Sequence, residues 1–157
     1  MSLFFFYTLF LILLDDKKCY TVCDLKTNKI RVLLNGGVNP KDSLMCFSSP
    51  DAMTSVTIKG KEYLVISEDT GGDKNGSASA QVAAKGEVYN EVYFLDLAIQ
   101  NPTLSDLQRF MMAPEGCETS GDMLTPDGKT YFVSIQHPSS TNPAPFNKSC
   151  VIAINGF

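Results

Sequence analysis

The sequence predicts an all-β protein that forms part of a β-propeller, with about two blades of antiparallel four-stranded sheet. First, short runs of β-branched and aromatic residues alternate with turn sequences along most of the chain. Second, residues 125–130 combine proline, aspartate and glycine in the order of a tight turn, and the strand-like run 131–135 follows. Third, residues 63–69 align with residues 131–137, and both copies follow a Gly-Lys pair by the same spacing.

The chain opens with an apolar segment, residues 3–14. This segment is shorter than the roughly 20 residues that a membrane-spanning helix needs. Its length suits the apolar part of a signal peptide, which would make the protein extracellular or periplasmic, but no Lys or Arg precedes it and no clear cleavage site follows. A buried strand and the start of a truncated gene are the alternatives. We therefore separate residues 1–18, an apolar N-terminal segment, from residues 19–157, the partial propeller domain.

In residues 19–157 the sequence predicts strands joined by polar turns, with a long exposed insertion at residues 74–86. The predicted strands are 20–25, 30–34, 52–57, 62–67, 91–97, 107–112, one beginning at Glu118, 131–135 and 150–154. Residues 52–112 then make one complete blade, with strands A to D, between parts of two others. Propellers typically contain about four to eight blades, so we expect a fragment of a longer propeller or a short relative that needs partner chains. Either case leaves strand edges open.

Composition argues against several classes of partner and site. The formal net charge is −4 and Lys and Arg do not cluster, so we expect neither a nucleic-acid surface nor one for anionic lipid. An odd number of cysteines leaves at least one unpaired, and their spacing gives no second pair for a zinc site. We expect free, buried thiols. The cysteines are Cys19, Cys23, Cys46, Cys117 and Cys150.

Acidic and amide side chains gather at one end of the predicted strands. Strands of a blade are antiparallel, so the loop before strand A and the loop after strand B share one rim. Glu118 begins an A strand. Glu68 and Asp69 follow one B strand, and Gln136 and His137 follow the next. Carboxylates that converge beside the chain's only histidine offer the oxygen ligands that calcium takes; the alternative is that they are solvated loop acids beside a structural histidine.

Residues 114–138 carry a more specific signal. They contain Gly-Cys-Glu-Thr-Ser-Gly at 116–121, Thr-Pro-Asp-Gly at 125–128 and Ile-Gln-His-Pro at 135–138. This order resembles the signature region of the PhoX-type alkaline phosphatase family, and an acidic loop at residues 66–72 is similar to another loop of that family.

The resemblance implies a six-bladed propeller several times longer than this chain, with calcium and iron held at its mouth. The family's iron-binding and phosphate-binding residues would lie partly outside this chain. Many members carry an arginine where this chain has Glu115, and an arginine there would be a natural contact for phosphate.

We therefore predict a metal-dependent phosphatase domain, or a piece of one, that acts on small phosphate monoesters. The alternative is a propeller-derived binding or scaffold module without catalysis. In the first case Glu68, Asp69 and Glu118 hold the metal, and Gln136 and His137 contact the substrate or support the metal ligands. Calcium is favoured over iron, missing blades or partner chains are needed, and no catalytic residue is assigned.

Other residues of the two motifs receive ordinary structural roles. Asp122 is expected to be a solvated charge, Asp127 a turn former and Cys117 a core residue. Ser67 and Ser134 have no histidine and acid in a recognisable nucleophile arrangement, which argues against a serine hydrolase.

Overall fold

The computed structural model describes residues 9–14, 19–24, 27–42, 45–69 and 89–157. Within these ranges the secondary structure is almost entirely antiparallel strand, and the only helical element is the short 3-10 helix η2 (Leu104–Asp106). No helix among these residues is long and apolar enough to cross a membrane. The predicted all-β fold class is confirmed.

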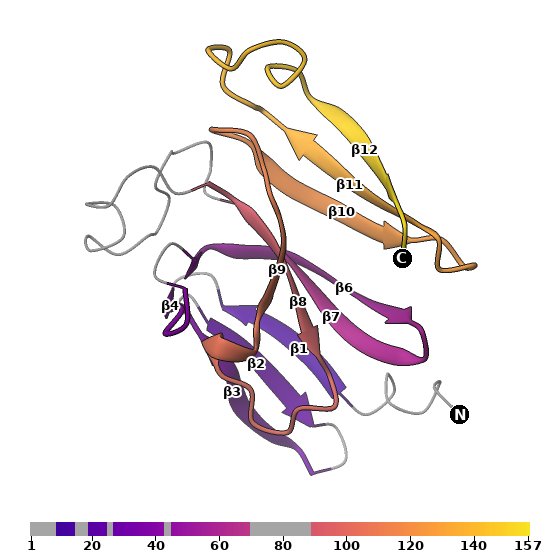
Figure 1. Ribbon diagram of the computed structural model, residues 1–157. Coiled ribbons are helices and arrows are strands. Elements are labelled where there is room, and N and C mark those ends of the chain that lie inside the picture. Colours follow the sequence, from indigo (N-terminus) through magenta and orange to yellow (C-terminus); the bar gives the residue numbers. More distant parts are fainter. Residues whose placement is uncertain (1–8, 15–18, 25–26, 43–44, 70–88) are drawn as a thin grey trace.

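Three main sheets follow one another along the described chain as separate layers (Figure 1). The first sheet contains β1 (Leu9–Leu14), β2 (Cys19–Asp24) and β3 (Lys29–Asn35). The second contains β6 (Pro50–Ile58), β7 (Lys61–Glu68), β8 (Glu91–Asp96) and β9 (Gln108–Met112). The third contains β10 (Glu118–Leu124), β11 (Thr130–Gln136) and β12 (Cys150–Asn155). In each sheet the strands that are consecutive in sequence pair with one another, which is the strand order of a propeller blade.

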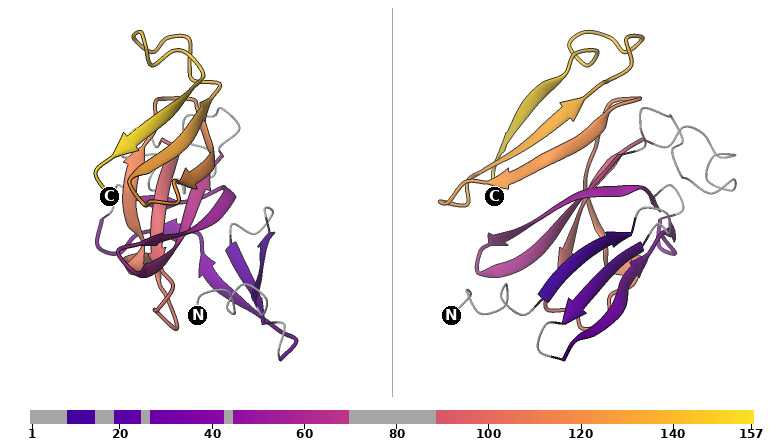
Figure 2. Two further views of the ribbon diagram at one scale, coloured as in Figure 1. Left: turned by 90° about the vertical axis from the view of Figure 1, so that its right-hand side faces the viewer. Right: turned by 180° about the vertical axis from the view of Figure 1, so that it is seen from behind.

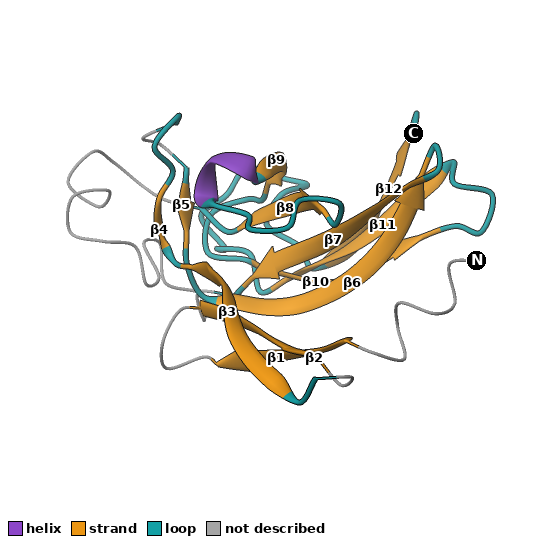
Figure 3. Cartoon of the chain, turned by 90° about the horizontal axis from the view of Figure 1, so that it is seen from below, coloured by secondary structure: helices purple, strands orange, loops and turns teal. Residues whose placement is uncertain are grey.

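Figure 2 shows the same layers from the side and from behind, and in the view from behind they fan out from one another. The second and third sheets meet along their first strands, because β10 packs against β6 and β7 (Figure 3). A small two-stranded ladder connects the first sheet to the second. Its strands are β4 (Gly37–Val38) and β5 (Cys46–Phe47).

Most predicted strands are present within a residue or two of their expected ends. The predicted first hairpin is β2 and β3, paired from Asp24↔Lys29 onward. Residues 9–14 form a further strand that pairs with β2. The ladder β4–β5 and the helix η2 were not predicted, because two-residue strands and single helical turns leave no periodic pattern. The predicted insertion at 74–86 lies outside the described residues.

The strands β7 and β11 differ in their pattern of buried residues. Residues 64–68 of β7 are buried without interruption, whereas β11 alternates between buried and half-buried positions. The difference follows from position, because the second sheet is covered on both faces and β11 is well covered on only one. One apolar cluster joins the second sheet to the segment around β3 and β5, through Leu34, Met45, Phe47, Leu64, Ile66, Tyr93, Leu95 and Leu107. The other cluster joins it to the third sheet, through Val56, Val65, Val92, Phe94, Tyr131 and Val133.

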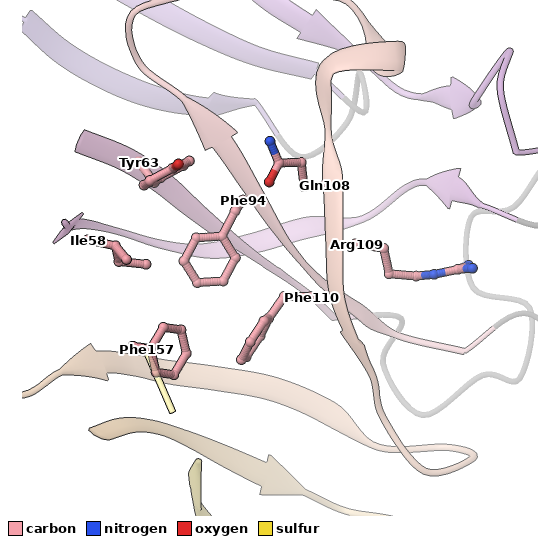
Figure 4. Close-up of a pocket in the computed structure, with 7 residues that line it drawn as sticks. All are labelled: Ile58, Tyr63, Phe94, Gln108, Arg109, Phe110 and Phe157. Atoms are coloured by element: carbon pink, nitrogen blue, oxygen red, sulfur yellow. The ribbon is translucent and has the colours of Figure 1, made fainter. Parts of the chain in front are cut away.

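An apolar hollow of about 210 Å³ opens between the second and third sheets (Figure 4). Its aromatic walls are edge-to-face or tilted pairs, with the rings of Phe94 and Phe110 5.0 Å apart and those of Phe110 and Phe157 5.5 Å apart. It is lined by Ile58, Tyr63, Phe94, Gln108, Arg109, Phe110 and Phe157. No carboxylate lines this hollow, so it differs in chemistry from the rim described below.

The outer edge of the third sheet predicts self-association. Among the described residues β12 has a strand on one side only, and Val151 at its start is 67% exposed. An open strand with apolar side chains is a template for pairing with another chain. We expect the purified chain to be oligomeric or prone to aggregate, and Val151→Lys to shift it toward monomer in light scattering after size-exclusion chromatography. Phe146→Lys, in a loop and 57% exposed, is the control for general hydrophobicity; a monodisperse wild-type monomer contradicts the prediction.

Candidate functional site

Strand register brings the predicted site residues to one rim. In the second sheet Pro50 pairs with Glu68, and in the third Glu118 pairs with Gln136. The starts of β6 and β10 therefore lie beside the ends of β7 and β11, as the antiparallel order requires. Packing of β10 against β6 and β7 then joins the rim ends of the two sheets into one surface.

Three carboxylates meet on this rim. One oxygen each from Asp51, Asp69 and Glu118 lies within 4.8 Å of the other two. Asp51 is exposed, and Asp69 and Glu118 are half-buried. The structure therefore brings together two of the predicted metal ligands and adds Asp51. The sequence did contain the signal for Asp51, because it lies at the start of β6 as Glu118 lies at the start of β10.

The electrostatic repulsion within the cluster affects the pKa of Glu118. Partial burial, followed by the charges of Asp69 and Asp51, raises the pKa of the Glu118 carboxyl above its ordinary value, and the nearby His137 opposes this rise. Like charges this close disfavour the ionised form of Glu118. A cation bound among the three carboxylates would remove that penalty, so the arrangement suits a positively charged ligand.

Two further predicted residues lie beside Glu118. The Gln136 side-chain amide donates hydrogen bonds from Nε2 to Glu118 Oε1 at 3.2 Å and to Ser120 Oγ at 2.6 Å. His137 is exposed and has a left-handed backbone, with φ of 52°, and its backbone N–H donates to Ser149 Oγ at 3.2 Å. Gln136, the last residue of β11, is thus positioned to orient the Glu118 carboxylate, and His137 follows directly after the strand.

Glu68 lies apart from these groups, because its side chain points inward. Its two carboxylate oxygens accept hydrogen bonds from the backbone N–H of Ser48 at 2.7 Å and of Glu91 at 3.0 Å. The residue is 1% exposed, and burial raises the pKa of its carboxyl well above the usual range. Glu68 therefore accepts structural hydrogen bonds beneath the rim, and its role as a metal ligand stays a prediction.

A second buried carboxyl group, Glu91, continues this network. It accepts hydrogen bonds from the Tyr93 hydroxyl and from Arg109 Nη1 at 2.8 Å. Arg109 also forms a 3.0 Å ion pair with the more exposed Asp42. Burial raises the pKa of Glu91, and the hydrogen bonds from Tyr93 and Arg109 counteract this rise. The sequence offered no sign of this network, because it is completed by Arg109 on β9 and by Asp42, which is distant in the chain.

Asp122 corrects one expectation from the sequence. It is not a solvated charge: its two oxygens accept hydrogen bonds from the hydroxyls of Tyr131 and Ser67. The cause is a β-bulge in β10, where the register shifts between Ser120 and Met123 and Gly121 takes φ of 66°. A bulge of this kind turns the following side chain out of the strand's alternation, and here it directs Asp122 toward the second sheet.

The cysteines agree in part with their expectation. Cys46 and Cys117 are buried thiols, whereas Cys150 is an exposed thiol. Burial raises the pKa of Cys117 to about 12, which keeps this thiol neutral at physiological pH in the absence of other charges. The side chains of Cys19 and Cys23 lie outside the described residues.

Comparison with known proteins gives the same family as the motifs. A family model described as Alkaline phosphatase PhoX matches residues 22–139, which is more than half of the chain and includes the whole acidic rim. The search of curated proteins found no match. Among solved structures the chain is similar to Pseudomonas fluorescens PhoX in complex with vanadate, a transition state analogue, with 33% identity and a TM-score of 0.48. That match covers 69% of this chain and 18% of the other. On the strength of the family match, the chain belongs to the PhoX alkaline phosphatase family.

Proposed function

We propose that this chain contributes a cation site to a metal-dependent phosphatase that hydrolyses small phosphate monoesters. The observation that carries the proposal is the convergence of Asp51, Asp69 and Glu118 on one rim, inside the segment that matches the family. The chain spans only 18% of the solved relative's length, so the hydrolytic activity of the whole enzyme belongs to the proposal.

The donor set fits a hard cation. Carboxylate oxygens are the ligands that calcium prefers, and calcium takes about six to eight oxygens in flexible geometry. Three carboxylates supply part of this number and leave positions for water, for a phosphoryl oxygen or for ligands from elsewhere. We favour calcium over iron for these residues, with Gln136 holding Glu118 in place through its amide.

Phosphate ester hydrolysis gives such a site a purpose. A cation at the rim would polarise a phosphoryl oxygen and help to generate a hydroxide-like nucleophile. The chain's own acids would orient and hold the cation. Glu115, in contrast, lacks the positive charge that would let it contact a phosphate group directly. The phosphate contact must then come from another residue or another part of the enzyme.

Calcium is expected to stabilise the folded chain. If the cation binds only the folded state, free calcium at 100 times its Kd adds about 2.7 kcal/mol to the free energy of unfolding. For a domain of this size that corresponds to a rise of roughly 5–10 °C in Tm, measured by thermal unfolding followed by circular dichroism. Glu118→Gln should remove most of the rise, because one charged ligand is lost.

Glu62→Gln is the matched control for that experiment. Glu62 allows the same replacement of Glu by Gln, but it lies at the end of β7 that is opposite to the rim. It should respond to calcium as fully as the wild type does. The shared site does not exist in this chain if millimolar calcium leaves the wild-type Tm unchanged, or if Glu118→Gln keeps the full response.

An activity assay separates catalysis from binding. Hydrolysis of p-nitrophenyl phosphate that requires added calcium or iron and is lost in Glu118→Gln supports the phosphatase proposal. Calcium binding without hydrolysis supports the second candidate, a propeller-derived binding module. The observation that favours the second candidate is Glu115, an acid at the position where the resemblance implies an arginine in many members.

A further inference from the structure

The joint between the second and third sheets is polar directly beneath the acidic rim. The Thr119 hydroxyl crosses from β10 to β7 and donates a 3.0 Å hydrogen bond to the backbone carbonyl of Glu68. Thr119 is fully buried. The side-chain amide of Asn90, also buried, crosses between the same sheets and donates to the carbonyl oxygen of Cys117. Buried groups of this kind are costly unless paired, so they favour one relative position of the two sheets.

A third crossing between the two sheets lies one strand step further from the rim. The hydroxyl of Ser67, also fully buried, donates a hydrogen bond to one oxygen of the Asp122 carboxylate, and the Tyr131 hydroxyl donates a hydrogen bond to the other. The bulge at Gly121 makes this contact possible, because it turns Asp122 toward β7. A Cβ at position 121 would lie 3.1 Å from Ser134 Oγ, so glycine also fits the space that this bulge leaves.

These crossings are adjacent in sequence to the clustered carboxylates. Glu68, whose carbonyl accepts the Thr119 bond, immediately precedes Asp69, and Thr119 immediately follows Glu118. Consecutive Cα atoms are about 3.8 Å apart. A single hydrogen bond between neighbours therefore fixes the two backbone positions from which the Asp69 and Glu118 side chains reach the rim.

The other half of the same joint could not hold this spacing. It is formed by aromatic rings around the hollow of about 210 Å³ (Figure 4), and apolar contact is not directional. Sheets in contact only through such rings could shift slightly relative to each other. Beneath the rim, a shift would break the bond from Thr119 and leave the Glu68 carbonyl without this donor.

We propose that Thr119 is a positioning residue for the cation site, setting the separation of Asp69 and Glu118 through its bond to the Glu68 carbonyl. The inference rests on the proposed function, because it assumes that these carboxylates bind a cation. It assigns Thr119 no contact with the cation itself. Residues that orient metal ligands typically change metal affinity by roughly 10–100-fold when replaced.

The test measures calcium affinity of the full chain by isothermal titration calorimetry. Thr119→Val keeps the shape of the side chain but removes the donor, and we expect calcium to bind at least about tenfold more weakly. Thr119→Ser keeps the donor and should bind calcium within about twofold of the wild type. Thr130→Val is the matched control, since the Thr130 hydroxyl donates to Asn155 Oδ1 at 2.7 Å at the far end of β11.

The outcomes separate this inference from the proposed function. If the wild type binds no calcium, both are overturned. If the wild type and Thr119→Val bind calcium equally well, the positioning role is overturned and the cation site stands. Should Thr119→Val fail to fold, Thr119→Ala removes the same donor with a smaller side chain and must bind calcium more weakly than Thr119→Ser; equal affinity in these two variants overturns the inference.

Discussion

Replacement of Glu68 by alanine is expected to lower the free energy of unfolding by about 2–6 kcal/mol. The Glu68 carboxylate accepts the backbone N–H groups of Ser48 and Glu91, and all three residues are buried. Each buried donor left without an acceptor costs about 1–3 kcal/mol. Because domains are typically stable by only about 5–15 kcal/mol, the variant is expected to unfold at much lower urea concentrations.

Urea unfolding followed by circular dichroism checks this expectation, with Glu62→Ala as the control. Glu62 lies at the other end of the same strand and is half-buried, so its replacement should change stability by about 0.5 kcal/mol or less. Glu68→Gln should cost less than Glu68→Ala, because its side-chain oxygen can still accept one of the two bonds. Equal urea midpoints for Glu68→Ala and the wild type would show that the buried carboxylate is not what satisfies these amides.

The Glu68 environment also shows where sequence reasoning fails. From the sequence, Glu68 and Asp69 are equivalent acids in one Gly-rich loop. In the structure β7 extends through Glu68, so successive side chains point to opposite faces. Asp69 reaches the rim and Glu68 turns into the interior. The end of a strand, which decides this, is the feature that sequence patterns locate least well.

The rim itself was predictable because antiparallel order is a strict geometric rule. Once the turns and strands were placed, the loop positions of Asp69, Glu118 and Gln136 required them to share one end of the sheets. Contacts that cross between sheets, such as Ser67 with Asp122, could not be predicted. They depend on the bulge at Gly121 and on the packing distance between layers, and neither leaves a periodic trace in the sequence.

Tyr131→Ala is expected to lower the free energy of unfolding by about 3–5 kcal/mol, the usual cost of removing a fully buried aromatic ring. The Tyr131 ring lies at the centre of the joint between the second and third sheets. Its centroid is 5.1 Å from that of Phe110, 5.8 Å from that of Phe157 and 5.9 Å from that of Phe94. Without the ring, the third sheet loses the apolar contacts that Tyr131 makes with Phe94 and Phe110 of the second.

Tyr131→Phe separates this apolar contribution from the polar one. Burial, followed by the neighbouring Asp122, raises the pKa of the Tyr131 hydroxyl well above its usual value, so the hydroxyl stays protonated and can donate to the carboxylate. Removing it should cost only about 1 kcal/mol, because Asp122 keeps its bond from Ser67. Urea midpoints of the two variants measure the difference. If Tyr131→Phe is as unstable as Tyr131→Ala, the hydrogen bonds beneath the rim, and not the aromatic contacts, hold the two sheets together.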